Sequence, residues 1–372
     1  MTSGLLPVGL RDRLPPEAEA ASRLLHRVIV AIGRHGYERV SPPLAEFEDE
    51  LVGRLKSARA QDLLRFVDPV SQRTLALRPD ITAQVGRIAA TRMGHRARPL
   101  RLAYGGPVVK LRATQLNPQR ELIQAGAELI GSDSVAAAIE LLDVAIEALE
   151  TAGVTALTVD LTLPDLVETL SKGALPLDAS RLAEVRAALD AKDAGRLTAL
   201  DAAAYLPFID AAGPIVPALT RLRALGIDAI ASRLDAIEAI AAALGDRVTL
   251  TLDPTERHGF EYQSWIGFSL FGCGASGEPL ASEVGRGGSY AVVHDNREEA
   301  AIGFSLYIDP LVDAGLGREP RRRLFLPLGA DPAAAARLRA EGWTTIAALS
   351  DRDDAAALGC SHRLVAGEAL PL

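Results

Sequence analysis

Two polar residues inside a short apolar segment constrain the fold of this chain more than any other feature. The segment 120–130 reads RELIQAGAELI and contains Gln124 and Glu128. On a β-strand, residues an even number of positions apart point to the same face. A buried glutamine and glutamate are costly unless other groups satisfy them. The segment therefore predicts either a ligand site or a buried hydrogen-bond network.

A second polar pair, Asp80 and Thr82, follows a predicted strand at 73–78. A carboxylate and a hydroxyl at this spacing can hold the ammonium group of an amino acid. The same D-x-T spacing after Pro79 is also typical of a helix N-cap. Asp80 alone therefore leaves both interpretations open.

The surrounding patterns predict an α+β fold. A helix begins after Pro15 and Pro16 and ends at Gly36, and Ser134 is the expected N-cap of a long amphipathic helix. Apolar stretches bounded by turn residues predict the strands. These are 73–78, 99–104, 120–130, 155–163, 247–254, 260–271 and 299–309.

Changes in composition divide the chain into four parts: 1–163, 164–246, 247–318 and 319–372. The second part is rich in Ala and Leu, is punctuated by glycines, and predicts a helical insertion. Its expected helices are 178–193, 198–205, 216–225 and 231–244. The last part reads strand, helix, strand, which predicts a small βαβ-like domain.

The composition predicts a cytoplasmic protein that binds neither nucleic acid nor membrane. The charges give a net value of −8, and no concentrated basic face is visible. No apolar run reaches the roughly 18 residues that a membrane span needs. Cys273 and Cys360 are far apart and form no metal-ligand cluster, so no metal or cofactor is expected.

Four segments resemble the catalytic core of a class II aminoacyl-tRNA synthetase, specifically histidyl-tRNA synthetase. LRPDIT (77–82) is similar to the family's LRPEGT, and 124–128 matches its Q-x-G-x-E segment. The stretch 256–271 is similar to the histidine-specific R-G-L-D-Y-Y stretch, and VGRGGSY (284–290) to a G-G-R-Y segment. The likeness covers roughly 5–315 and implies an antiparallel sheet flanked by helices.

The resemblance also implies a histidine-binding site. Tyr262 matches the first tyrosine of the histidine-specific stretch, Gln263 replaces the second, and His258 replaces its arginine. The implied histidine-binding residues are Asp80, Thr82, Gln124, Glu128, Tyr262 and His258.

The nucleotide side of the same frame departs from the family. In the motif-2-like loop, which holds Lys110, Arg112 and Arg120, lysine replaces the arginine that pins the ATP α-phosphate. Arg112 replaces a glutamate, and Pro310 replaces the arginine that ends motif 3. Lysine lacks the planar bidentate fork of arginine, and proline has neither charge nor donor. Because such contacts are often worth several kcal/mol each, adenylation activity is not expected.

This selective loss resembles the regulatory subunits of ATP phosphoribosyltransferase, which are synthetase paralogues without catalytic activity. The resemblance implies a short catalytic subunit as partner, a hetero-octamer, a homodimer through the synthetase-like interface, and L-histidine as effector. It implies a role in the first step of histidine biosynthesis, in supporting activity and in feedback inhibition. Residues 319–372 then resemble a truncated anticodon-binding domain.

Three alternatives remain open from the sequence. The chain could be an active histidyl-tRNA synthetase, although Pro310 argues against it. It could be a synthetase-like protein with another partner or amino acid, because Asp80 and Gln263 depart from the family pattern. Feedback histidine could also bind at the partner interface, with the pocket only inherited.

Overall fold

The polar segment forms one strand of a nine-stranded sheet. The computed structural model describes residues 6–52, 63–112, 118–257, 263–294 and 297–372. The strand order is β1-β5-β6-β12-β11-β10-β7-β9-β8. Neighbours are antiparallel except for the parallel pairs β1–β5 and β7–β9. The strands are β1 (Glu38–Arg39), β5 (Leu100–Val109), β6 (Glu121–Ile130), β7 (Thr155–Thr162), β8 (Gly213–Pro214), β9 (Thr249–Leu252), β10 (Gln263–Cys273), β11 (Gly285–His294) and β12 (Arg297–Tyr307).

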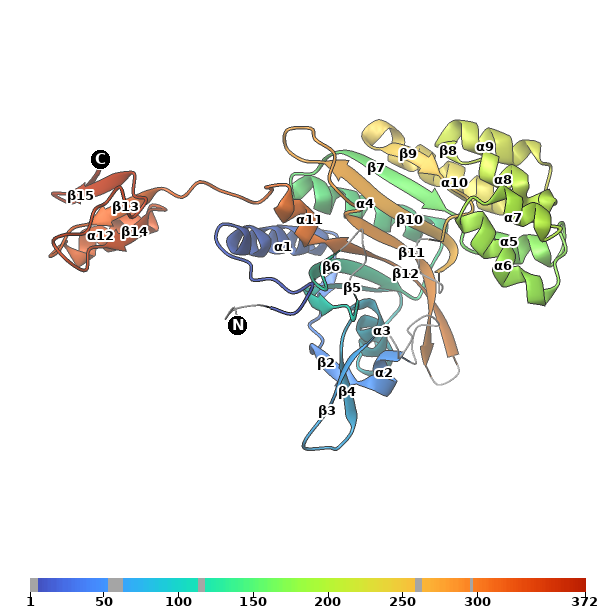
Figure 1. Cartoon of the computed structure of the whole chain (residues 1–372), viewed down its shortest axis with the longest axis horizontal. Coiled ribbons are helices and arrows are strands. Elements are labelled where there is room, and N and C mark those ends of the chain that lie inside the picture. The colour runs from blue at the N-terminus through green and yellow to red at the C-terminus, as the bar shows by residue number, and fades with distance from the viewer. Residues whose placement is uncertain (1–5, 53–62, 113–117, 258–262, 295–296) are drawn as a thin grey trace. The chain divides into compact units, whose positions relative to one another are not determined.

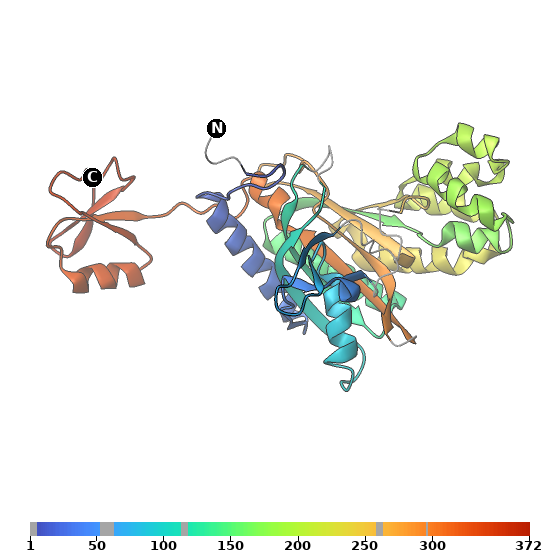
Figure 2. The ribbon, with the colours of Figure 1, turned by 60° about the horizontal axis from the view of Figure 1, so that its bottom comes forward.

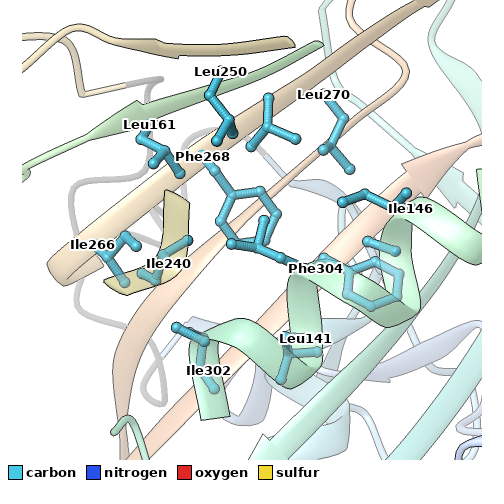
Figure 3. Packing of buried hydrophobic residues seen from close by; sticks show 14 of the residues in the cluster. Leu141, Ile146, Leu161, Ile240, Leu250, Ile266, Phe268, Leu270, Ile302 and Phe304 are labelled. Atoms are coloured by element: carbon cyan, nitrogen blue, oxygen red, sulfur yellow. The ribbon is translucent and has the colours of Figure 1, made fainter. Parts of the chain in front are cut away.

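One face of this sheet carries the main hydrophobic core. Helices α1 (Glu17–Arg34), α4 (Val135–Thr151) and α10 (Ala231–Leu244) pack on it, and α11 (Ile308–Asp313) follows β12. Figure 3 shows Phe268 and Phe304 of the sheet packed among apolar side chains that include Leu141 of α4 and Ile240 of α10. Burial of aromatic and aliphatic side chains of this size is the main stabilising contribution to such a core.

Helix α3 (Thr82–Thr91) covers part of the opposite face, where a second apolar cluster includes Ile81, Val85 and Tyr104. Beside it stands a three-stranded sheet in the order β2-β4-β3 (Figure 1). Its elements are β2 (Ala45–Phe47), α2 (Glu48–Val52), β3 (Leu64–Val67) and β4 (Thr74–Leu77).

Most of the predicted helical insertion lies on the side of the large sheet where β9 and β8 end the strand order (Figures 1 and 2). It contains α5 (Leu166–Ser171), α6 (Ala179–Asp190), α7 (Ala194–Ala199), α8 (Leu206–Asp210) and α9 (Ile215–Ala224), followed by α10. Short 3-10 turns occur at Ala203–Tyr205, Asp228–Ile230 and Gly245–Arg247. No helix within the described ranges combines the length and apolar character needed to cross a bilayer.

The chain forms two compact units, residues 1–317 and 318–372. The second unit holds β13 (Arg323–Leu326), α12 (Pro332–Ala340), β14 (Thr344–Ala347), β15 (His362–Val365) and β16 (Glu368–Pro371). Strand β13 lies parallel to β14 across the α12 connection, which is a βαβ unit.

The α+β class and the class II synthetase-like architecture predicted from the sequence are confirmed. Ser134 caps α4 as expected, since its side-chain oxygen accepts from the Ala137 N–H at 3.3 Å. The predicted helix 198–205 is wrong. Asp193 caps an earlier helix by accepting from the Arg196 N–H at 2.8 Å. Asp201 then takes a left-handed conformation with φ of 53°, which stops the helix.

We expect Phe268→Ala to lower the free energy of unfolding by about 3–5 kcal/mol, because a fully buried phenylalanine leaves a cavity. The matched control is Phe271→Ala on the same strand, where the side chain is 40% exposed and Phe268 is 0% exposed. Urea denaturation in a Trp343→Phe background measures both variants, with Trp265 as the remaining fluorophore. Equal losses in the two variants would contradict this placement of the core.

Candidate functional site

A row of small residues forms the floor of a pocket on the face opposite the main core. Glu128 of β6 pairs with Gly303 of β12, which pairs with Gly288 of β11, which pairs with Gly267 of β10. A Cβ atom at Gly303 would clash with the Glu128 carboxyl group. The glycine at this position therefore lets the glutamate side chain lie flat against the sheet.

Glu128 is buried and is held by hydroxyl groups from three other elements. The Tyr104 hydroxyl of β5 donates to Oε1 at 3.1 Å, and the Tyr290 hydroxyl of β11 donates to Oε2 at 2.7 Å. The Thr82 hydroxyl lies 3.2 Å from the Tyr104 hydroxyl and also bonds to the carboxyl group. Burial raises the pKa of Glu128 to about 8, although these hydroxyls oppose the shift. The neutral carboxylic acid is therefore the main form at pH 7.

Gln124 and Asp80 form a second polar group beside Glu128. The Gln124 amide nitrogen donates to Asp80 Oδ2 at 2.5 Å and to Ser305 Oγ at 2.6 Å. Its oxygen accepts the Ile81 N–H at 3.0 Å. Gln124 is thus satisfied within the protein and ties the start of α3 to the sheet.

The other Asp80 oxygen accepts the Thr82 N–H at 2.7 Å, at the start of α3. This bond joins Asp80 to the residue two positions later, and the N-cap position of α3 is Ile81, which makes no side-chain capping bond. Of the predicted set, Thr82 and Glu128 line the pocket, whereas Asp80 and Gln124 bond to each other next to it. The predicted residues His258 and Tyr262 lie outside the described residues.

Several pocket residues were missed by the sequence analysis. Tyr290, Ser305, Gln263 and Arg286 line the pocket, and Tyr104 bonds to Glu128 beside it. These residues come together only through the register of β5, β6, β12, β11 and β10.

The pocket is small. Its walls leave about 20 Å³ of space, which is room for about one water molecule. An amino acid can therefore enter only if lining side chains move aside.

Arg286 is a long cationic side chain that lines the pocket. Its Nε donates to Glu283 Oε1 at 2.6 Å, three positions earlier in the chain. Lys110 lies close to the same region, with its ammonium 5.8 Å from the centre of the Tyr307 ring. Burial lowers the pKa of Lys110, and the neighbouring Arg286 lowers it further.

The other two residues of the motif-2-like loop, Arg112 and Arg120, do not line the pocket. Arg112 is exposed. The Arg120 carbonyl accepts the Lys110 N–H at 2.7 Å, and the Arg120 N–H donates to the Gly9 carbonyl at 2.7 Å. Arg120 therefore fastens the N-terminal segment to β6 instead of facing the pocket floor.

Pro310 occupies the first turn of α11, where a missing N–H is tolerated. The preceding Asp309 is buried and accepts from Arg13 Nη2 at 2.8 Å and from the Ile123 N–H at 2.7 Å. The end of β12 is thus tied to the N-terminal segment and to β6. Within the described residues, no group of three or more His, Cys, Asp or Glu side chains is placed to hold a metal ion.

The amino-acid sequence of this chain is similar to those of known proteins. The model of the histidyl-tRNA synthetase family matches residues 9–311. An ATP phosphoribosyltransferase regulatory subunit from Rhodospirillum centenum is 41% identical, over 98% of this chain and 95% of that protein. A protein of the same name from Gluconobacter oxydans is 36% identical, over 100% of this chain and 98% of that protein.

Solved structures agree with these relatives. An ATP phosphoribosyltransferase regulatory subunit/histidyl-tRNA synthetase from Bacillus halodurans has a TM-score of 0.81 and 25% identity, over 96% of each chain. A histidyl-tRNA synthetase from Nostoc has a TM-score of 0.78 and 14% identity, over 98% of this chain and 92% of that one. The second likeness concerns the fold alone.

The raised pKa of Glu128 has a consequence for stability. The unfolded carboxyl group loses its proton near pH 4.5, whereas the folded one keeps it to about pH 8. Between these values the unfolded chain binds fewer protons, so the contribution of Glu128 to the unfolding free energy falls as pH rises. The slope is at most about 1.4 kcal/mol per pH unit.

We therefore expect Glu128→Gln to gain stability relative to the unsubstituted chain between pH 5 and pH 8, because glutamine has no proton to lose. Urea denaturation of both proteins at the two pH values measures this change, and other titrating groups cancel in the difference. A stability difference that is the same at pH 5 and pH 8 would show that Glu128 does not titrate in this window.

Proposed function

The chain belongs to the family of ATP phosphoribosyltransferase regulatory subunits, and from this we propose that it is the non-catalytic regulatory subunit of that enzyme. It supports a short catalytic subunit in the first step of L-histidine biosynthesis. It has no catalytic activity of its own. Relatives of this name align with almost the whole chain, so the function covers both compact units.

One contrast within the site supports this function. The side of the pocket suited to an amino acid retains Glu128, Thr82 and the Gln124–Asp80 pair. The side that would hold a nucleotide has Pro310 in α11, and Arg112 is exposed. A site with amino-acid partners but without its phosphate-binding arginines can bind a ligand but cannot activate it.

The finer proposal is that the effector L-histidine binds this pocket. Thr82 and Glu128 supply polar partners from the walls, and the proposed ligand set also includes Asp80, Gln124, Tyr262 and His258. Entry of histidine requires Arg286 or another lining side chain to move, since the present space is about 20 Å³. Histidine binding then changes the free energy of the conformation that contacts the catalytic subunit. Binding of the catalytic subunit must in turn change the affinity for histidine by the same factor.

We also propose the assembly that goes with this role. The chain forms a homodimer through its synthetase-like interface, and such dimers join the short catalytic subunits in a hetero-octamer. The protein acts in the cytoplasm, where its partner enzyme works. It needs no cofactor, nucleic acid or membrane for this role.

We expect the chain to raise the activity of the catalytic subunit from the same organism and to make it sensitive to histidine. Glu128→Ala should keep the assembly and the activation but lose most of the inhibition, because the buried partner of the ligand is gone. Enzyme assays across histidine concentrations and co-purification measure these effects.

Glu278→Ala is the control, because this glutamate is exposed and is not among the residues that line the pocket. Unchanged inhibition in Glu128→Ala would move the histidine site to the partner interface. Failure of the unsubstituted chain to co-purify with the catalytic subunit would overturn the regulatory function itself.

The alternative of an active histidyl-tRNA synthetase predicts histidine-dependent exchange between ATP and pyrophosphate. We expect exchange at background level, with or without the catalytic subunit, because the phosphate-binding arginines are replaced. A histidyl-tRNA synthetase is the positive control. Exchange above background would support the alternative.

A further inference from the structure

One lysine fastens the helical insertion to the chain that leads into strand β10 of the pocket. Lys192 follows α6, and its ammonium group donates to Asp253 Oδ1 at 2.6 Å and to Thr255 Oγ1 at 2.5 Å. Both acceptors belong to the segment 253–257, which follows β9. The side chain of Lys192 is 35% exposed and that of Asp253 is 15% exposed. Water and salt therefore screen this ion pair less than a pair on the open surface.

The backbone of Lys192 has a conformation that lysine rarely adopts. Its φ is 55°, in the left-handed region, and it lies one position beyond Ala191, the C-cap of α6. The Lys192 N–H donates to the Leu189 carbonyl at 3.0 Å, and the Asp193 N–H donates to the Ala188 carbonyl at 2.8 Å. These bonds form a Schellman ending, where glycine is the usual residue. A lysine in a strained position that suits glycine points to a role for its side chain.

Two further hydrogen bonds join the end of α6 to the same segment. The Thr255 hydroxyl donates to the Leu189 carbonyl at 3.4 Å, and the Arg257 N–H donates to Asp190 Oδ1 at 3.1 Å. Asp253 Oδ1 also accepts the Thr255 N–H at 3.1 Å, which holds the segment in a turn. The position of the segment therefore depends on the end of α6.

The segment 253–257 in turn contacts the pocket floor. The Glu256 carbonyl accepts a hydrogen bond from the hydroxyl of Thr162, a fully buried residue of β7. Thr162 pairs with Gly267 of β10, and a Cβ atom at Gly267 would clash with Thr162 and with the pocket residue Gln263. Both side chains therefore lie against the same glycine. A continuous series of contacts thus joins the insertion to the pocket.

We propose that Lys192 is a positioning residue for the pocket and couples its occupancy by L-histidine to the position of the helical insertion, an inference that rests on the proposed function. The ammonium group holds the segment 253–257 in the arrangement in which the pocket binds histidine. Bound histidine in turn favours the contact between Lys192 and Asp253, because coupling between two sites is reciprocal. Without this contact histidine inhibits less well, but the chain still joins and activates the catalytic subunit.

The first test replaces Lys192 by glycine in the full-length chain, in complex with the catalytic subunit. Glycine removes the ammonium group and suits the left-handed backbone, so the variant should fold, and thermal unfolding checks this. We expect the histidine concentration for half-inhibition to rise about fivefold, with activation in the absence of histidine unchanged. An unchanged concentration in the folded variant would overturn the inference.

Asp201→Gly is the matched control. Asp201 follows α7 with a left-handed φ of 53°, and its N–H donates to the Thr198 carbonyl at 3.0 Å at the same kind of helix end. Its side chain is exposed. Glycine suits the backbone at this position too, so histidine inhibition should stay as in the unsubstituted complex. An equal loss of inhibition in Asp201→Gly would show that the helix ends, and not the Lys192 ammonium group, determine the effect.

Asp253→Asn tests the ion pair from its other side. Asparagine keeps a side-chain oxygen for the Thr255 N–H but removes the charge. We expect Asp253→Asn to weaken histidine inhibition as Lys192→Gly does, and the double variant to lose no more than the larger single loss. Additive losses would mean that the two residues act separately, which contradicts the inference.

Hydrogen exchange measures the coupling directly. In the unsubstituted complex, histidine should slow amide exchange at the end of α6 and in the segment 253–257, and Lys192→Gly should abolish this effect. A histidine effect on these amides that persists in Lys192→Gly would count against a role for the lysine.

These outcomes are distinguishable from failure of the proposed function. If histidine neither binds nor inhibits the unsubstituted complex, the proposed histidine site fails, and the role of Lys192 fails with it. If histidine inhibits the unsubstituted complex and Glu128→Ala abolishes inhibition, but Lys192→Gly keeps full inhibition, only the role of Lys192 is wrong.

Discussion

The site depends on a carboxyl group that the sheet buries among hydroxyl groups. Glu128 receives its described hydrogen bonds from Tyr104, Tyr290 and Thr82, which come from two strands and the start of α3. A buried carboxylate is costly without a compensating charge, so the neutral acid is favoured. The strands must keep their register for this network to form, because a small shift would leave several buried groups unsatisfied at once.

The two faces of the sheet are therefore linked. Along β12, Gly303 and Ser305 face the pocket, whereas the alternate residues Ile302 and Phe304 belong to the apolar core. Large side chains on one face hold the strands against α4 and α10, and small side chains on the other leave space for polar groups. Since alternate residues of one strand serve both faces, a change in core packing can move the pocket floor.

Local patterns predicted much of this arrangement, and non-local pairing explains what they missed. Gln124 and Glu128 are on one strand, so their shared face follows from spacing alone. Tyr290 and Gln263 join Glu128 only because distant segments pair in a particular register, which composition and spacing do not encode. The predicted helix 198–205 failed where a side-chain cap at Asp193 and the left-handed backbone of Asp201 decided the boundaries. Asp193 and Asp201 set the limits of α7, and the apolar pattern extended past them.

The polar groups of the site differ in what they reveal about a ligand. Gln124, Asp80 and Glu128 satisfy one another and their neighbours, so stability requires them whether or not a ligand binds. The Gln263 oxygen is different, because it is buried and no described residue pairs with it. This oxygen belongs to a residue that lines the roughly 20 Å³ of pocket space, where a hydrogen-bond donor from a water molecule or a ligand can satisfy it.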